Sequence, residues 1–175
     1  MLHTMKIQLL TDGSQHESLT EVMTRFNQVC NHISEIGFQT KTHTNKIKLS
    51  NECYHPVREQ YAIPSQMVVR AIGKVVEAYK SGVKSVQKFG ETTSVVYDMR
   101  LLTFKWMNRV SISTLNSRIE IPFRVESYRP GAYDRRVSGL ADLILENDQF
   151  YLLLLVDLPS ETSGSGVKEL AGVGY

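Results

Sequence analysis

Long hydrophobic runs are missing from this sequence of 175 residues. The longest purely apolar stretch, residues 150–156, is closed by Asp157, whereas a membrane-spanning helix needs about 20 apolar residues. The amino end alternates apolar and polar residues, so no secretory signal is visible. We therefore expect a cytoplasmic protein without membrane contact, in which residues 150–156 form a buried strand.

Cysteine is scarce, because the chain has only Cys30 and Cys53, and this excludes a disulfide scaffold. Each cysteine belongs to a C-x-H pair, with His32 or His55, and two thiolates with two imidazoles would suit tetrahedral zinc. The spacing within each pair differs from that of known zinc motifs, and Cys30 lies on an apolar helix stripe. We therefore expect structural cysteines, no bound metal and no cofactor.

Catalytic motifs are also missing: the sequence has no G-x-S-x-G, no phosphate-cradling glycine loop and no H-E-x-x-H. Asp98, Asp142 and Asp157 lie in or beside predicted strands and could in principle bind magnesium. Nothing in their spacing brings these carboxylates together. The expectation is a protein that is not an enzyme, with a metal-dependent enzyme as an open alternative.

The charge is small overall, at +2, but it is unevenly distributed. Between Pro64 and Arg109, eight lysines and arginines stand against three acids, a net of +5. From Glu146 onward, five acids stand against the single base Lys168. A basic middle indicates a polyanionic partner, and the alternative is a solvated helix face.

Hydrophobic periodicity divides the chain into one strand, then helices, then a run of strands. A strand over 5–10 leads through a turn into a helix that Ser14 and Glu17 open as a capping box, ending near Gly37. A connection is predicted over 40–51, and further helices over 53–61 and 64–82. Strands are predicted over 94–98, 101–106, 110–115, 118–125, 139–145 and 150–158, with a basic loop over 127–138.

The first strand cannot be stable alone, so it must join the later sheet. This predicts an α+β fold, a β-barrel or curled sheet built from residues 1–10 and 94–159. Residues 11–93 form a helical insertion in it, and 160–175 have the composition of a linker or tail.

Candidate nucleic-acid contacts lie in this basic middle and in the loop that follows. Gln66, Arg70 and Lys74 share one polar helix face, and a glutamine side chain can read base edges. Basic residues beyond that face are Lys80, Lys84, Lys88, Arg129, Arg135 and Arg136. Aromatic residues that could stack on bases, or else lie in the core, are Tyr54, Tyr61, Tyr97 and Trp106.

The order of several motifs resembles that of the transposon-encoded TnpB (OrfB-type) proteins. Residues 26–34 match an F-N-x-x-C-N-x-I-S pattern, and "YAIPSQMVVRAIGKVVEAYKS" resembles the next helical signature of that family. The segments "SVVYDMRLLTF", "VSISTLNSRIEIPF" and "GLADLILENDQFYLLLLVDLP" resemble its sheet segments. The resemblance extends to about Pro159.

The resemblance implies the recognition half of an RNA-guided DNA endonuclease. In such proteins a wedge β-barrel with an inserted helical recognition domain binds guide RNA and a short DNA motif. It implies that Gln66, Arg70 and Lys74 face DNA or the hybrid, and that Tyr54 lies near the DNA-reading surface. The RuvC domain that cuts DNA would begin with a magnesium-binding Asp about where Gly174 stands, so we expect a truncated chain without nuclease activity.

The function expected from these observations is that of a nucleic-acid-binding fragment of a TnpB-like transposon protein, with guide RNA and DNA as partners. The alternative is a protein-interaction module, or a regulator of a full-length relative, that does not bind nucleic acid directly.

Overall fold

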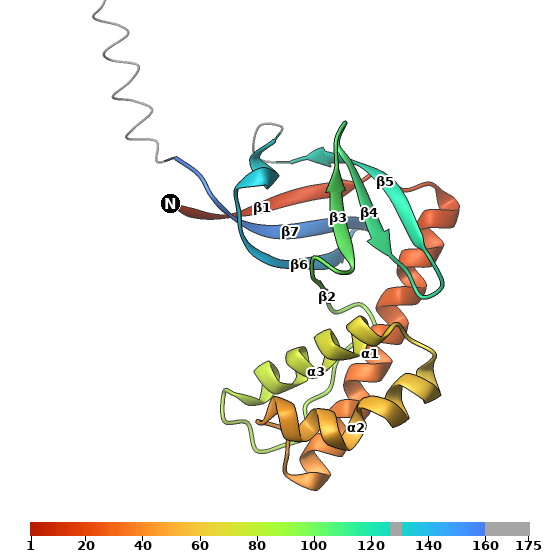
Figure 1. Cartoon of the computed structure of the whole chain (residues 1–175), viewed down its shortest axis with the longest axis vertical. Coiled ribbons are helices and arrows are strands. Elements are labelled where there is room, and N and C mark those ends of the chain that lie inside the picture. Colours follow the sequence, from red (N-terminus) through yellow and green to blue (C-terminus); the bar gives the residue numbers. More distant parts are fainter. Residues whose placement is uncertain (127–130, 160–175) are drawn as a thin grey trace, which may run out of the picture.

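The computed structural model of the chain describes residues 1–126 and 131–159. Within these ranges a curled sheet lies at one end of the molecule and three helices at the other (Figure 1). The helices are α1 (Gly13–Thr40), α2 (Lys46–Tyr61), α3 (Ser65–Tyr79) and the short 3-10 helix η1 (Ala132–Arg135). The strands are β1 (Leu2–Leu9), β2 (Val95–Tyr97), β3 (Leu102–Lys105), β4 (Arg109–Ser113), β5 (Arg118–Val125), β6 (Arg136–Glu146) and β7 (Gln149–Asp157).

The seven strands form one antiparallel sheet in the order β2-β6-β7-β1-β5-β4-β3. Its two edge strands, β2 and β3, follow one another in the chain through a tight turn. In that turn the amides of Leu101 and Leu102 donate to the Asp98 carbonyl, each at 2.9 Å. The sheet therefore curls into a nearly closed, barrel-like form, and the predicted α+β class is confirmed (Figure 1).

Strand β1 lies in the middle of this sheet, between β7 and β5. It pairs with β7 from Leu2 to Gln8 and with β5 from Ile7 to Leu9. Its alternation buries Met5, Ile7 and Leu9 completely. The prediction that the first strand joins strands far along the chain is confirmed. All three α-helices lie between β1 and β2 in the chain, and their separation into a domain over 11–93 stays a prediction.

Helix α1 begins and ends differently from the prediction. Its N-cap is Asp12, not Ser14: Asp12 Oδ1 accepts from the Gln15 amide at 2.8 Å, and Gln15 Oε1 accepts from the Asp12 amide at 3.0 Å. The helix continues to Thr40, and Lys41 takes the left-handed cap conformation with φ 58°. Gly37 is instead a site of close approach, because a Cβ there would lie 3.2 Å from His43 Cα.

Helix α2 begins inside the segment predicted as a connection, so the second half of that prediction is wrong. Asn45 caps it, accepting from the Lys48 amide at 3.0 Å. Leu49, Cys53 and Val57 recur at four-residue steps and are buried against the rest of the helical core. Most of the other residues of α2 are polar, so this narrow stripe gives only a weak helical pattern in the sequence.

Helix α3 and the later strands follow their predicted positions closely. Helix α3 starts directly after Pro64, and β5 has the predicted bounds 118–125. The predicted loop over 127–138 is wrong in its second part, because η1 and the start of β6 occupy it. Residues 127–130 and the predicted tail 160–175 lie outside the described residues.

Two asparagines of α1, one buried and one partly buried, join the helix to the segment that leads into β2. The side chain of Asn27 donates to the Thr93 carbonyl at 2.9 Å and accepts from Thr93 Oγ1 at 2.5 Å. One turn later, Asn31 donates to the Phe89 carbonyl at 2.9 Å and accepts from its amide at 2.7 Å. These amides replace a backbone ladder where the chain returns from the helices to the sheet.

We predict that Asn27→Ala lowers the free energy of unfolding by about 2 kcal/mol, because the part-buried carbonyl groups of Glu91 and Thr93 lose their side-chain donor. Urea denaturation followed by circular dichroism measures this change. Gln28→Ala, at the next and exposed position, is the control and should stay within about 0.5 kcal/mol. Equal stability of the two variants would show that Asn27 is dispensable.

Candidate nucleic-acid interface

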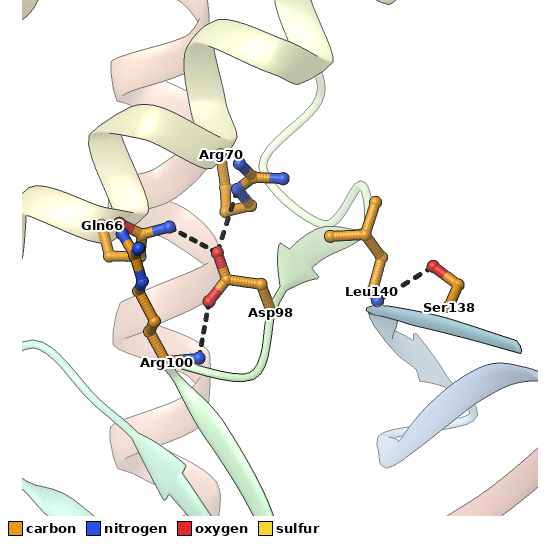
Figure 2. Close-up of polar contacts among 6 residues, drawn as sticks. All are labelled: Gln66, Arg70, Asp98, Arg100, Ser138 and Leu140. Atoms are coloured by element: carbon orange, nitrogen blue, oxygen red, sulfur yellow. Dashed lines mark hydrogen bonds and ion pairs between the residues drawn. The ribbon is translucent and has the colours of Figure 1, made fainter. Parts of the chain in front are cut away.

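The polar face of α3 meets the carboxylate of Asp98, which follows β2 (Figure 2). Asp98 Oδ2 accepts from Gln66 Nε2 at 2.5 Å and lies 3.2 Å from Arg70 Nε. Its Oδ1 accepts from the Arg100 amide at 2.9 Å. Asp98 is therefore the centre of a joint that ties the helix to the turn between the two edge strands.

Lys74, one turn farther along α3, belongs to the same contact region. Its ammonium group donates to the Ser94 carbonyl and, at 3.3 Å, to Thr93 Oγ1. It also lies 5.6 Å from the ring centroid of Phe26 and 5.4 Å from that of Phe89. Burial lowers the pKa of Lys74.

The structure thus brings Gln66, Arg70 and Lys74 together on one face, as their spacing predicts, but this face packs against the sheet edge. A hollow of about 360 Å³ beside it is lined by Lys46 and Glu77 as well as by Arg70 and Lys74. Of the cations that line the hollow, Arg70 pairs with Asp98, and Lys74 is bonded to Ser94 and Thr93. Contact of the three residues with nucleic acid stays a prediction.

The remaining helical candidates are scattered. Lys80 pairs with Glu77 at 2.9 Å, and Lys84 and Lys88 are exposed in the connection from α3 to β2. Tyr54, on α2, is partly buried against the hydrophobic core. In the described part of the chain, no hydrogen bond or ion pair links these positions to the joint around Asp98.

The arginines predicted in a basic loop do not all lie in a loop. Arg136 starts β6 instead, with its guanidinium 4.6 Å above the Phe104 ring and donating to the Tyr133 carbonyl at 3.1 Å. Partial burial lowers the pKa of Arg136. Arg135 is exposed at the end of η1. Arg129 lies outside the described residues.

The residues considered for metal chemistry do not converge. Across 1–126 and 131–159, no group of three or more histidines, cysteines or acids is placed to hold a metal ion. Asp98 pairs with Arg70, and Asp157 pairs with the amino terminus at 2.7 Å. Asp142 lies on β6, where partial burial raises the pKa of its carboxyl group.

A cationic surface that the sequence analysis missed lies on the outward side of β3, β4 and β5. The strand register aligns Lys105 with Arg109, and Ser113 with Arg118. Because side chains alternate along each strand, the same side also carries Arg124 and one carboxylate, Glu120. We call the surface of Lys105, Arg109, Arg118, Glu120 and Arg124 the outer sheet face.

Side chains of the outer sheet face are held by their neighbours. Arg118 donates to Ser111 Oγ at 3.0 Å, to Thr103 Oγ1 at 3.1 Å and to the Arg100 carbonyl at 2.9 Å. Arg109 lies 3.4 Å from Glu120, and Arg124 lies 3.6 Å from Glu126. Both ion pairs are solvent-exposed and therefore weak, so a phosphate can replace either carboxylate as the partner.

The candidate stacking residues differ strongly in their exposure to solvent. Tyr97 is buried in the core and donates to the Ser113 carbonyl at 2.7 Å, and Tyr61 donates to or accepts from His32 Nδ1 at 3.1 Å. Trp106, in contrast, is 81% exposed at the tip of the β3–β4 hairpin. The outer sheet face is next to this tip, since Lys105 and Arg109 are the last paired residues of the hairpin.

Comparison with known proteins finds a distant likeness among solved structures. No protein-family model and no curated protein matches the chain. A similar solved structure is described as "Cryo-EM structure of the Cas12f1-sgRNA-target DNA complex", with 12% identity and a TM-score of 0.48. The match covers 91% of this chain and 49% of that chain, so this chain spans about half the length of that protein.

Membrane insertion through a helix has no support in the described part of the chain, where every helix is too short or too polar to span a bilayer.

We predict that Asp98→Ala lowers the free energy of unfolding by about 2 kcal/mol, because Gln66 and the Arg100 amide lose their shared acceptor and Arg70 loses its ion-pair partner. Thermal and urea unfolding measure the effect. Glu52→Ala, which removes an exposed carboxylate from α2, is the control. A loss no larger than that of the control would contradict the assigned role of Asp98.

We also predict that both thiols resist modification in the folded protein. Burial raises the pKa of Cys30 to about 12 and that of Cys53 to about 11, so neither forms the reactive thiolate at pH 8. Ellman's reagent should therefore titrate two thiols only after urea unfolding. Rapid labelling of either cysteine without urea would contradict this expectation.

Proposed function

We propose that this chain binds nucleic acid through phosphate contacts on the outer sheet face. The observation that carries the proposal is the placement of four cations on three adjacent strands, where the carboxylates beside them are Glu120 on β5 and Glu126 directly after it. Neighbouring strands lie about 4.8 Å apart, so these cations extend over roughly 10 Å and can follow several phosphates. A nucleic-acid backbone carries negative charges at regular intervals, which a row of cations of this length can contact.

The motif order that resembles TnpB proteins supports a finer form of this proposal. In that form the chain is the guide-RNA and target-DNA recognition half of an RNA-guided nuclease-like protein, and it binds without cutting. The helices then supply a second contact region around Gln66, Arg70 and Lys74. In the structure these side chains are tied to the sheet edge, so we assign them first the positioning of the helices.

The test compares two charge-matched double variants in fluorescence anisotropy with a labelled structured RNA and a labelled DNA duplex. Lys105→Gln with Arg124→Gln removes two cations from the outer sheet face. Lys84→Gln with Lys88→Gln removes two from the exposed connection before β2. Only the first variant should weaken binding, and its slope of log K against log salt should be smaller by about 1 to 2.

Two results would overturn the proposal. One is the absence of binding by the wild-type protein even at low salt. The other is an equal loss in both double variants, because that would mean a general effect of net charge. A larger loss for Arg70→Gln than for the outer-sheet variant would move the interface to α3, as the sequence alone predicts.

The protein-interaction alternative has one observation in its favour. Three apolar side chains, Val137, Leu140 and Leu155, are exposed around an irregularity in the β6–β7 pairing. Met99, in the turn between the edge strands β2 and β3, is also exposed. This alternative predicts that partner binding survives nuclease treatment and does not change in the Lys105→Gln, Arg124→Gln variant.

A further inference from the structure

The tip of the β3–β4 hairpin exposes two large apolar side chains next to each other. Trp106 is 81% exposed and Met107 is 73% exposed. Tryptophan is highly buried on average, so a solvated tryptophan beside a solvated methionine requires an explanation. Figure 1 shows that the hairpin points away from the helices, and no element covers its tip in the described part of the chain.

The exposure does not come from a loose loop. Lys105 pairs with Arg109, and the left-handed residues Met107 and Asn108, with φ 61° and 52°, close the turn between them. The Asn108 carbonyl accepts from the Phe123 amide of β5 at 2.8 Å. The tip is therefore fixed to a third strand and presents Trp106 in a preorganised position.

An aromatic cluster supports the hairpin from the inside. Phe104 stacks on Tyr133 with ring centroids 5.0 Å apart and meets Phe123 edge-on at 5.6 Å. Arg136 lies 4.6 Å from the Phe104 ring. Because Phe104 is two residues before Trp106, the strand that carries the tryptophan is anchored immediately below the tip.

We propose that Trp106, with Met107 beside it, is a stacking platform for unpaired bases of a bound nucleic acid. This inference rests on the proposed function, because the outer sheet face would hold the phosphates of the same strand. Every base has a flat π-face, and an exposed aromatic side chain next to cations is the usual combination for holding single strands. Lys105 and Arg109 flank the tryptophan and supply that charge.

The charged neighbours favour this occupant over a membrane or an apolar protein surface. Lys105 is exposed, and Arg109 forms a solvent-exposed ion pair with Glu120 at 3.4 Å. Lys105 directly precedes Trp106, and Arg109 pairs with Lys105 across the hairpin, so an apolar partner that covered Trp106 would have to desolvate them. A nucleic acid instead offers phosphates to the cations and a base to the ring.

Trp106 is the only tryptophan of the chain, so its intrinsic fluorescence reports on this site alone. The full chain is titrated with a labelled oligothymidine and with a blunt, fully paired duplex, and label anisotropy and tryptophan emission are read in the same samples. The single strand should quench the emission over the concentration range in which anisotropy rises. The duplex should raise the anisotropy with little quenching.

Two variants complete the experiment, and thermal melting checks that both remain folded. Trp106→Ala should weaken single-strand binding about 5- to 150-fold and leave duplex binding within about 2-fold. Trp106→Phe keeps an aromatic ring and should retain most of the affinity. Met99→Ala, which removes an exposed methionine from the edge turn, is the matched control and should bind like the wild type.

The outcomes separate the inference from the proposed function. If no oligonucleotide raises the anisotropy, the proposed function fails. If anisotropy rises while emission stays constant and Trp106→Ala binds like the wild type, the function stands and the stacking site is wrong. A change of emission with phosphatidylserine vesicles but not with oligothymidine would overturn the inference in favour of a membrane contact.

Discussion

The position of β1 in the middle of the sheet is the constraint on which the rest of the structure depends. The strand is paired on both sides, with β7 and with β5, so the chain must leave the sheet from its centre. The Leu10 amide donates to the Pro122 carbonyl at 2.8 Å, and Gln15 Nε2 donates to the Glu120 carbonyl at 3.1 Å. These bonds set the direction of α1, and α1 in turn provides the surface on which α2 and α3 pack.

The return from the helices to the sheet uses polar side chains in place of a continuous backbone ladder. Asn27, Asn31, Lys74 and Asp98 all bond across this connection. Basic residues of α3 are therefore used inside the molecule, whereas those of β3, β4 and β5 remain available to solvent. The division explains why a cationic surface lies on the sheet, although the basic stretch of the sequence begins in a helix.

The sequence predicted those features that local pattern controls. Strand β5 and the start of α3 after Pro64 are examples. The long-range pairing of β1 was predictable for a different reason, because a lone strand is unstable. The sequence could not predict that Arg70 meets Asp98, because a helical period shows which side is polar but not what packs against it. The outer sheet face depends on register between three strands, and the exposure of Trp106 runs against the usual burial of tryptophan.

The central claim, that nucleic acid lies on the outer sheet face, is tested most directly by mapping cross-links. A bound RNA carrying 4-thiouridine is irradiated, and the cross-linked peptides are identified by mass spectrometry. The account predicts cross-links concentrated in residues 102–124, across β3, β4 and β5. Cross-links confined to α3 and the connection before β2, with none on these strands, would contradict it.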